Sequence, residues 1–231
     1  MKALLIIPIF LFSLLFAQTE SSKWYLGLQG GAGQSFRTLE PTSEDEIILI
    51  DILNGAESPI TGMNGGLVLG RKITDHIWLE SGIQVSRLGK MIYTKSDSLV
   101  NDPDLPDETK FIDLYYHLNI PLLLKAYTNR GKFRGLLFYG GQFNFKLDYD
   151  DKRIEIFYDG FNRFSVSNLS GDFHPVVLSL VGGAGVSFNP HERFSIEGRF
   201  LARRDITPIA DAPIRQKMHY VAGNIIGAFH F

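Results

Sequence analysis

Residues 111–127 read FIDLYYHLNIPLLLKAY and alternate between two kinds of side chain along their length. The even positions are apolar: Ile112, Leu114, Tyr116, Leu118, Ile120, Leu122, Leu124 and Ala126. The odd positions include Asp113, His117, Asn119 and Lys125. A period of two is typical of a β-strand. The run also exceeds the about 9–11 residues that a tilted strand needs to cross a bilayer, so it predicts a spanning strand with one apolar and one polar face.

The same alternation recurs along the chain. The eight predicted strands cover about 23–36, 60–72, 77–94, 109–127, 133–148, 174–189, 193–205 and 218–231. Their connections alternate between tight turns, at 74–76, 128–131 and 189–192, and long polar loops, at 37–59, 95–108, 149–173 and 206–217. Short turns on one side and long loops on the other are the pattern of outer-membrane barrels. The sequence therefore predicts an all-β fold, an eight-stranded antiparallel up-and-down transmembrane β-barrel with both termini on the periplasmic side.

The polar faces of these runs carry charges of both signs. The residues expected to form a polar network in the lumen are Glu80, Gln84, Asp113, His117, Lys125, Arg134, Glu197, Arg199 and Arg203. Eight strands leave an interior only wide enough for side chains, and buried charges must be paired there. Alternation alone leaves two alternatives open, a soluble lipocalin-type barrel with an apolar cavity and a soluble β-sandwich with solvated charges.

The N-terminus has the outline of a secretory signal peptide. Lys2 precedes an apolar run from Ala3 to Phe16, followed by the small residue Ala17. The run is short for a spanning helix, so residues 1–17 are predicted to be removed; a retained anchor is the alternative. Residues 18–231 are then a single outer-membrane barrel domain. The chain has no cysteine, which excludes a lipoprotein anchor and disulfides.

Composition and motifs narrow the chemistry. A net charge of −2 with interspersed signs leaves no basic face for nucleic acid. The sequence shows no phosphate-binding glycine loop and no His/Cys metal spacing, so no cofactor, metal or catalytic residue is predicted. An alternative enzyme site would use His117, near Asp113, and His174, near Ser179.

Two of the long loops are rich in carboxylates. These are Glu40, Glu44, Asp45 and Glu46 in the first loop, and Asp97, Asp102, Asp104, Asp107 and Glu108 in the second. Such groups could hold divalent cations that bridge outer-membrane lipid and lipopolysaccharide, although a solvated loop is the simpler interpretation. The apolar residues 47–53 in the first loop could extend a strand or contact another protein.

Two single positions carry further expectations. Pro121 donates no ladder hydrogen bond, so a bulge is expected there in the fourth predicted strand. The last predicted strand ends in Phe229 and Phe231, separated by one residue. A terminal aromatic residue after alternating apolar residues resembles the signal read by the barrel-assembly machinery, so these two residues are the expected assembly signal.

Two motifs resemble the PorT-like outer-membrane β-barrel family, common in Bacteroidetes and built like OmpA and OmpX barrels. The stronger is the run 111–125, with its Ile-Pro-Leu-Leu-Leu-Lys core; Asn119 stands where an acidic residue is usual in the family. The weaker is Leu79–Lys90, with Glu80, Gly82 and Gly89. The resemblance spans about residues 24–231. It implies an accessory of secretion or surface assembly.

Three functional hypotheses follow from these observations. The first is a non-enzymatic structural or interaction protein of the cell envelope, with a protein partner contacted through the long loops. The second is a narrow channel or transport component. The third is a lipid-modifying or proteolytic barrel enzyme.

Overall fold

The computed structural model describes residues 24–41, 47, 50, 56–95, 106–128, 131–157, 161–167, 173–191, 193–210 and 214–231. The predicted signal peptide lies outside these residues. The strands are β1 (Trp24–Glu40), β2 (Glu57–Lys72), β3 (Ile77–Lys95), β4 (Glu108–Tyr127), β5 (Phe133–Ile156), β6 (Asn162–Ser167), β7 (Val176–His191), β8 (Phe194–Asp205) and β9 (Arg215–His230). No helix among the described residues is long and apolar enough to cross a bilayer.

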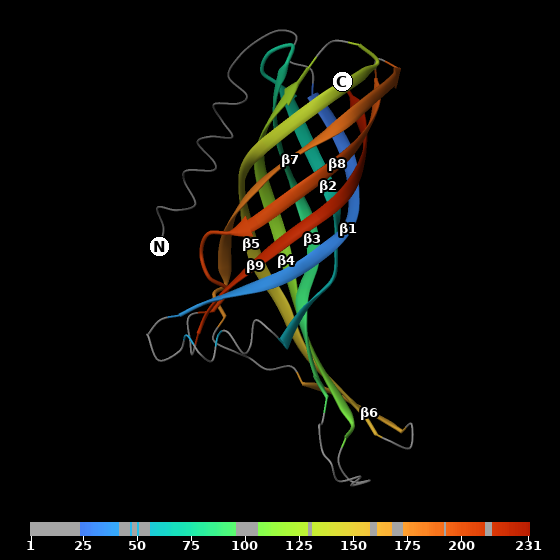
Figure 1. Cartoon of the computed structure of the whole chain (residues 1–231). Coiled ribbons are helices and arrows are strands. Elements are labelled where there is room, and N and C mark those ends of the chain that lie inside the picture. Colours follow the sequence, from blue (N-terminus) through green and yellow to red (C-terminus); the bar gives the residue numbers. More distant parts are fainter. Residues whose placement is uncertain are drawn as a thin grey trace.

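Eight of the strands close into a ring (Figure 1). Each of β1 to β4 pairs antiparallel with the next strand, and then β5 pairs with β7, β7 with β8 and β8 with β9. The ring closes where β9 pairs with β1, from Tyr25↔His230 to Glu40↔Arg215. The predicted eight-stranded up-and-down barrel is confirmed.

Side-chain orientation follows the alternation read from the sequence. Along β8 the exposed and buried positions alternate without a break. Leu28, Leu137, Phe200 and Ile225 face outward with 62–69% of their surface exposed, whereas Glu197, Arg199 and Arg203 of β8 are buried inside. An apolar exterior around a polar interior is the arrangement of a membrane-spanning barrel and the reverse of a soluble lipocalin.

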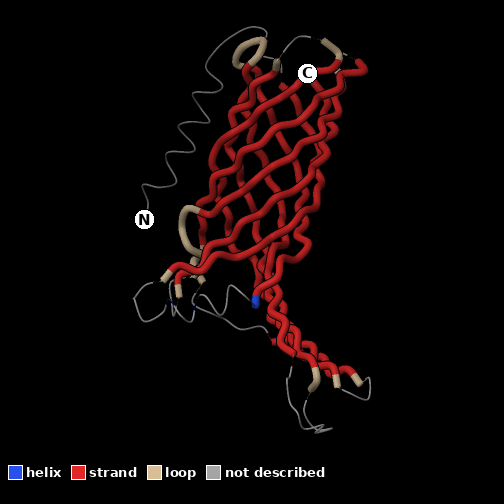
Figure 2. Tube along the Cα trace, in the orientation of Figure 1, coloured by secondary structure: helices blue, strands red, loops and turns tan. Residues whose placement is uncertain are grey.

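A sheet that the sequence did not predict projects from the long-loop end of the barrel (Figure 2). Strands β3, β4 and β5 stay paired beyond the barrel, as far as Lys95↔Glu108 and Glu108↔Ile156. Strand β6 adds to β5 from Asp151↔Ser167 to Ile156↔Asn162. The prediction of a loop over all of 149–173 was therefore wrong. Outside the bilayer both faces of a strand are wet, so no apolar alternation marks it.

The expected bulge lies elsewhere than at Pro121. The register of β4 with β3 and β5 is unshifted around Pro121, which stands opposite Gln142. The shift falls instead between Tyr116 and His117, where β5 contains the extra residue Leu147. Beside the proline the pairing of β3 with β4 is interrupted, but its register does not change. The Ser81 hydroxyl donates to the Pro121 carbonyl there at 2.8 Å.

Candidate functional site

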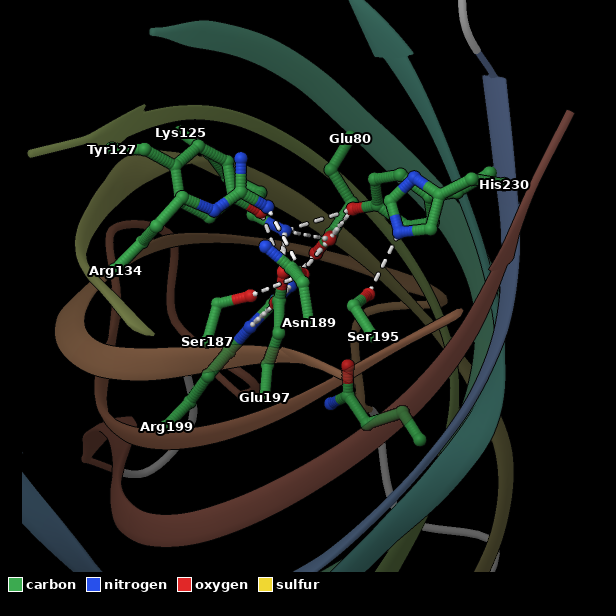
Figure 3. A network of polar contacts seen from close by, with 12 residues as sticks. Glu80, Lys125, Tyr127, Arg134, Ser187, Asn189, Ser195, Glu197, Arg199 and His230 are labelled. Atoms are coloured by element: carbon green, nitrogen blue, oxygen red, sulfur yellow. Dashed lines mark hydrogen bonds and ion pairs between the residues drawn. The ribbon is translucent and has the colours of Figure 1, made fainter. Parts of the chain in front are cut away.

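The centre of the lumen holds two carboxylates and two cations from three strands (Figure 3). Glu80 comes from β3, Lys125 from β4, and Glu197 and Arg199 from β8, each at an inward position of its strand. Their side chains are at most 3% exposed. Strand parity explains why each points inward, and the register of the ring brings them to the same level.

Each cation in this group binds both carboxylates. Arg199 donates to Glu80 through both terminal nitrogens, at 2.6 Å each, and its Nε donates to Glu197 at 2.9 Å. The Lys125 Nζ lies 3.1 Å from Glu80 and 2.9 Å from Glu197. The four formal charges cancel. We call these four residues the lumen ion-pair network.

Two phenols complete the hydrogen bonding of this network. Tyr25 donates to Glu80 and accepts from the Lys125 ammonium at 2.9 Å. Tyr127 donates to Glu197 at 2.5 Å. A buried ion pair persists only when its remaining polar atoms are satisfied, and these two phenols supply that satisfaction. Tyr25 also packs against Trp78, with ring centroids 5.5 Å apart, on the short-turn side.

Glycines of β1 and β2 make room for large side chains in the lumen. An added Cβ at Gly70 would lie 1.9 Å from the ring of Tyr25 of β1, and one at Gly31 would lie 1.7 Å from the amide oxygen of Asn224 of β9. Glycine in a strand often marks such a close approach. At these glycines the wall is therefore thin, and neighbouring side chains fill the space.

An amide-rich layer lies next to the ion-pair network, toward the long loops. The Asn119 Nδ2 donates to Ser86 at 2.8 Å, and the Asn144 Nδ2 donates to Ser179 at 2.6 Å. A cavity of about 30 Å³ is lined by Gln84, Asn119, Asn224 and neighbouring residues. This volume suits about one or two water molecules, so it is far too small for a solute to pass.

The outer part of the lumen is closed by a further polar cluster and by aromatic rings. Arg203 pairs with Asp205 at 3.2 Å. Phe173 covers Tyr149, with ring centroids 4.7 Å apart, and Tyr115, at 5.7 Å. Among the described residues, side chains thus fill the lumen from the ion-pair network to these aromatic rings.

Charges also pair at the outer mouth. The Lys90 Nζ lies 3.0 Å from Asp113 and 3.7 Å from Glu57, and Glu57 also pairs with Arg37. The Tyr149 hydroxyl donates to Asp113 at 3.0 Å. These groups join β1, β2, β3, β4 and β5 at the level where the projecting sheet leaves the barrel.

The residues predicted for the lumen do not form one continuous cluster. Glu80, Lys125, Glu197 and Arg199 meet, whereas Arg203 pairs with Asp205 and Asp113 belongs to the outer mouth. Gln84 donates to Gln29 at 3.4 Å. Arg134 lies toward the short turns, over the Tyr127 ring and 3.2 Å from Asn189. His117 is buried, and its Nδ1 has no hydrogen-bond partner among the described residues.

Sequence reasoning missed several members of these clusters. Tyr25, Tyr127 and Asp205 share the inward parity of the predicted residues, which was the available signal. The Ser195 and His230 side chains, 2.8 Å apart near the short turns, come from neighbouring strands whose register could not be read from the sequence. Arg37 and Glu57 lay in a predicted loop, where no parity could be assigned.

Of the residues considered for an enzyme site, Ser179 and Asp113 are held by structural partners. The Ser179 hydroxyl donates to Asp205 at 2.6 Å and accepts from Asn144, and Ser179 is 1% exposed. A hydroxyl held in this way is not available to a substrate. Within the described part of the chain no group of three potential metal ligands occurs.

Only part of the two acidic loops can be placed. Glu40, Asp107 and Glu108 are described, and the other six carboxylates named above lie outside the described residues. Glu40 accepts from Lys217 at 2.7 Å. Of the apolar residues 47–53, Ile50 is buried with Leu39 and Ile214.

A closed eight-stranded ring, an apolar exterior and a filled, charge-paired interior together define an outer-membrane β-barrel protein. The family described as "Outer membrane protein beta-barrel domain" matches residues 16–202. The chain belongs to this family, and its location is the bacterial outer membrane.

Solved structures with a similar overall arrangement have low sequence identity to this chain. OprG from Pseudomonas aeruginosa is 13% identical, with 92% of this chain and 97% of that chain covered and a TM-score of 0.47. Neisserial surface protein A is 11% identical, with 88% and 95% covered and a TM-score of 0.41. Ail of Yersinia pestis is 13% identical, with 92% and 100% covered and a TM-score of 0.36. No curated protein matches the sequence significantly.

Proposed function

We propose that this protein is a non-enzymatic interaction protein of the outer membrane, an accessory of a secretion or surface-assembly system. The observation that carries the proposal is the projecting sheet, which presents a strand edge and exposed apolar side chains outside the barrel. The filled lumen supports it, because a lumen closed by paired charges leaves little room for transport. The resemblance to PorT-like barrels agrees with an accessory role.

Contacts within and between its strands hold the projecting sheet in shape. The Arg153 guanidinium lies 2.6 Å from Glu155 of the same strand, β5, and Arg163 of β6 approaches that carboxylate from the neighbouring strand at 3.7 Å. A hydrogen bond to Glu108 of β4 raises the pKa of Tyr93 of β3. A sheet tied across its strands can present a fixed surface to a partner.

Strand β6 forms an edge of this sheet. Among the described strands it pairs with β5 alone. Phe164 and Val166, on one face, are 60% and 49% exposed, and Phe161 just before the strand is 59% exposed. An edge strand offers unpaired backbone groups, and alternate apolar side chains add specificity when an extended segment joins it. We propose that the partner adds an extended segment to this edge.

A crosslinking experiment in intact outer membranes tests this proposal. A photoreactive residue at Ser165 should capture a partner protein, and the double change Phe164→Lys and Val166→Lys should abolish the capture. Thr94→Lys is the control, since it adds a positive charge at an exposed position of β3, away from β6, and leaves the hydrogen bond between Tyr93 and Glu108 in place. Capture that survives the double change, or that the control abolishes equally, would contradict β6 as the recognition edge.

Two further proposals concern assembly and export. Phe229 and Phe231 are 52% and 64% exposed, which leaves them accessible to the barrel-assembly machinery as its recognition signal. Residues 1–17 act as the export signal in this proposal. Replacing both phenylalanines by serine should leave export intact and lower the folded fraction, seen as loss of heat-modifiable gel mobility.

A further inference from the structure

A row of outward-facing side chains crosses three neighbouring strands at the outer edge of the apolar belt. Arg204 of β8 stands opposite His219 of β9, which stands opposite Phe36 of β1. All three face away from the lumen, because their chain neighbours Arg203, Asp205, Met218, Tyr220 and Ser35 are buried. We call Arg204, His219 and Phe36 the outer basic row. We include in it Lys217, the next outward-facing residue of β9 toward the long-loop end.

Strand length places this row at the membrane interface. At the short-turn end the same three strands carry an apolar row, with Phe194 opposite Phe229 and Phe229 opposite Leu26. From the apolar row to the outer basic row each strand advances by ten positions, which is the length that a tilted strand needs to cross the apolar layer. The outer basic row therefore lies where acyl chains give way to headgroups in the outer leaflet.

The charges of this row are incompletely neutralised by the protein. Lys217 lies 2.7 Å from Glu40. Arg204 is exposed and has no acidic partner among the residues that the structure describes. The His219 ring stacks on Phe36, with centroids 5.2 Å apart and planes at 10°, which forms a flat apolar floor beside the guanidinium. Ile206, 51% exposed, continues the apolar surface just after the end of β8.

The geometry points to a binding site for the phosphate group of an outer-leaflet lipid at Arg204. A guanidinium binds phosphate through two parallel hydrogen bonds. The acyl chains of such a lipid would lie along Ala202, Val221 and Phe200 below it. An arginine facing lipid costs little at the interface and more with depth, so its position suits a headgroup contact.

The opposite outer rim has a different charge pattern. There Arg87 of β3 stands opposite Tyr116, and Tyr116 stands opposite Asp148 of β5. The Tyr116 hydroxyl also donates to Asp150 at 3.3 Å. Carboxylates beside the cation make that rim unsuitable for an anion. The proposed lipid therefore occupies one sector of the barrel, over β8, β9 and β1.

Binding of diphosphoryl lipid A to the folded barrel in detergent, followed by native mass spectrometry, tests the site. We expect Arg204→Gln to weaken retention of the lipid by about tenfold, the loss expected for one charge-assisted hydrogen-bonded contact. Arg204→Lys keeps the charge but loses the two parallel hydrogen bonds of the guanidinium, so its affinity should lie between those of the wild type and Arg204→Gln. Arg71→Gln is the matched control, because Arg71 faces outward from β2 at the short-turn end; it should bind like the wild type.

Heat-modifiable gel mobility checks that every variant is folded. Lipid A without its phosphates should bind the wild type as weakly as the intact lipid binds Arg204→Gln. Equal binding with and without the phosphates would overturn the proposal. Equal losses from Arg204→Gln and Arg71→Gln would also overturn it, as would full displacement of the lipid by inorganic phosphate at matched concentration.

Discussion

Replacing Lys125 by methionine should destabilise the barrel strongly, although no contact with lipid or solvent changes. The side chain is fully buried and donates hydrogen bonds to the Tyr25 hydroxyl, to Glu80 and to both oxygens of Glu197. Methionine is similar in length and cannot make any of them. Arg199 would then face two carboxylates alone, leaving one uncompensated negative charge in the lumen.

The size of the effect follows from that imbalance. Removing one partner of a buried ion pair costs about 3–5 kcal/mol, because the other charge stays buried without compensation. Replacing a pair by neutral groups costs far less. The double variant Glu80→Gln with Lys125→Met keeps the Glu197–Arg199 pair and a neutral lumen, so it should recover part of the loss.

The measurement is urea unfolding of the protein folded into lipid vesicles, followed by gel mobility without heating. The single and double variants and the wild type are compared under the same conditions. A loss below about 1 kcal/mol for Lys125→Met, as for a solvent-exposed ion pair, would refute the dry, charge-paired lumen. A double variant that is less stable to urea than Lys125→Met alone would refute the proposed charge balance.

Three further predictions test the walls and the lumen. Leu122→Arg, on the lipid face, should cost about 2–4 kcal/mol or block assembly, whereas Gln84→Asn, a change inside the lumen that adds no charge, should be tolerated better in the same unfolding assay; equal damage would contradict the facing. Gly33→Ala brings a Cβ within 1.9 Å of the Val221 carbonyl and should cost about 1–3 kcal/mol through overpacking. Gly198→Ala, where a Cβ meets nothing within 4 Å, should fold like the wild type. In planar bilayers the wild type should stay at baseline conductance, whereas Arg199→Ala should show channel openings. Wild-type openings equal to those of the variant would instead favour a channel function.

The sequence predicted the barrel because a bilayer imposes a pattern that can be read from single strands. In β8, each inward residue from Ser195 to Asp205 follows from parity alone. Parity identified Glu80, Lys125, Glu197 and Arg199 as inward residues. It could not predict that these four meet, because their levels in the lumen depend on the register between strands far apart in the chain.

The projecting sheet could not be predicted for a related reason. Asp150 and Lys152 look like loop residues, since water lies on both faces of the sheet and no apolar face is required. The extra residue Leu147 also reverses the parity of β5 at this point, so alternation read from the barrel cannot be continued outward. Strand ends on the outer side were therefore assigned too short, as at Ile156 of β5 and Arg215 of β9.

The pairing of β9 with β1 has a consequence for biogenesis. The ring has no free edge only after its last strand has found its first, for example Leu26 with Phe229, and almost the whole domain lies between them. Until then both strands expose unpaired amides and carbonyls, which the hydrocarbon layer cannot hydrate. A chain with this topology cannot insert one strand at a time, because β9 and β1 must pair before either edge is surrounded by the hydrocarbon layer.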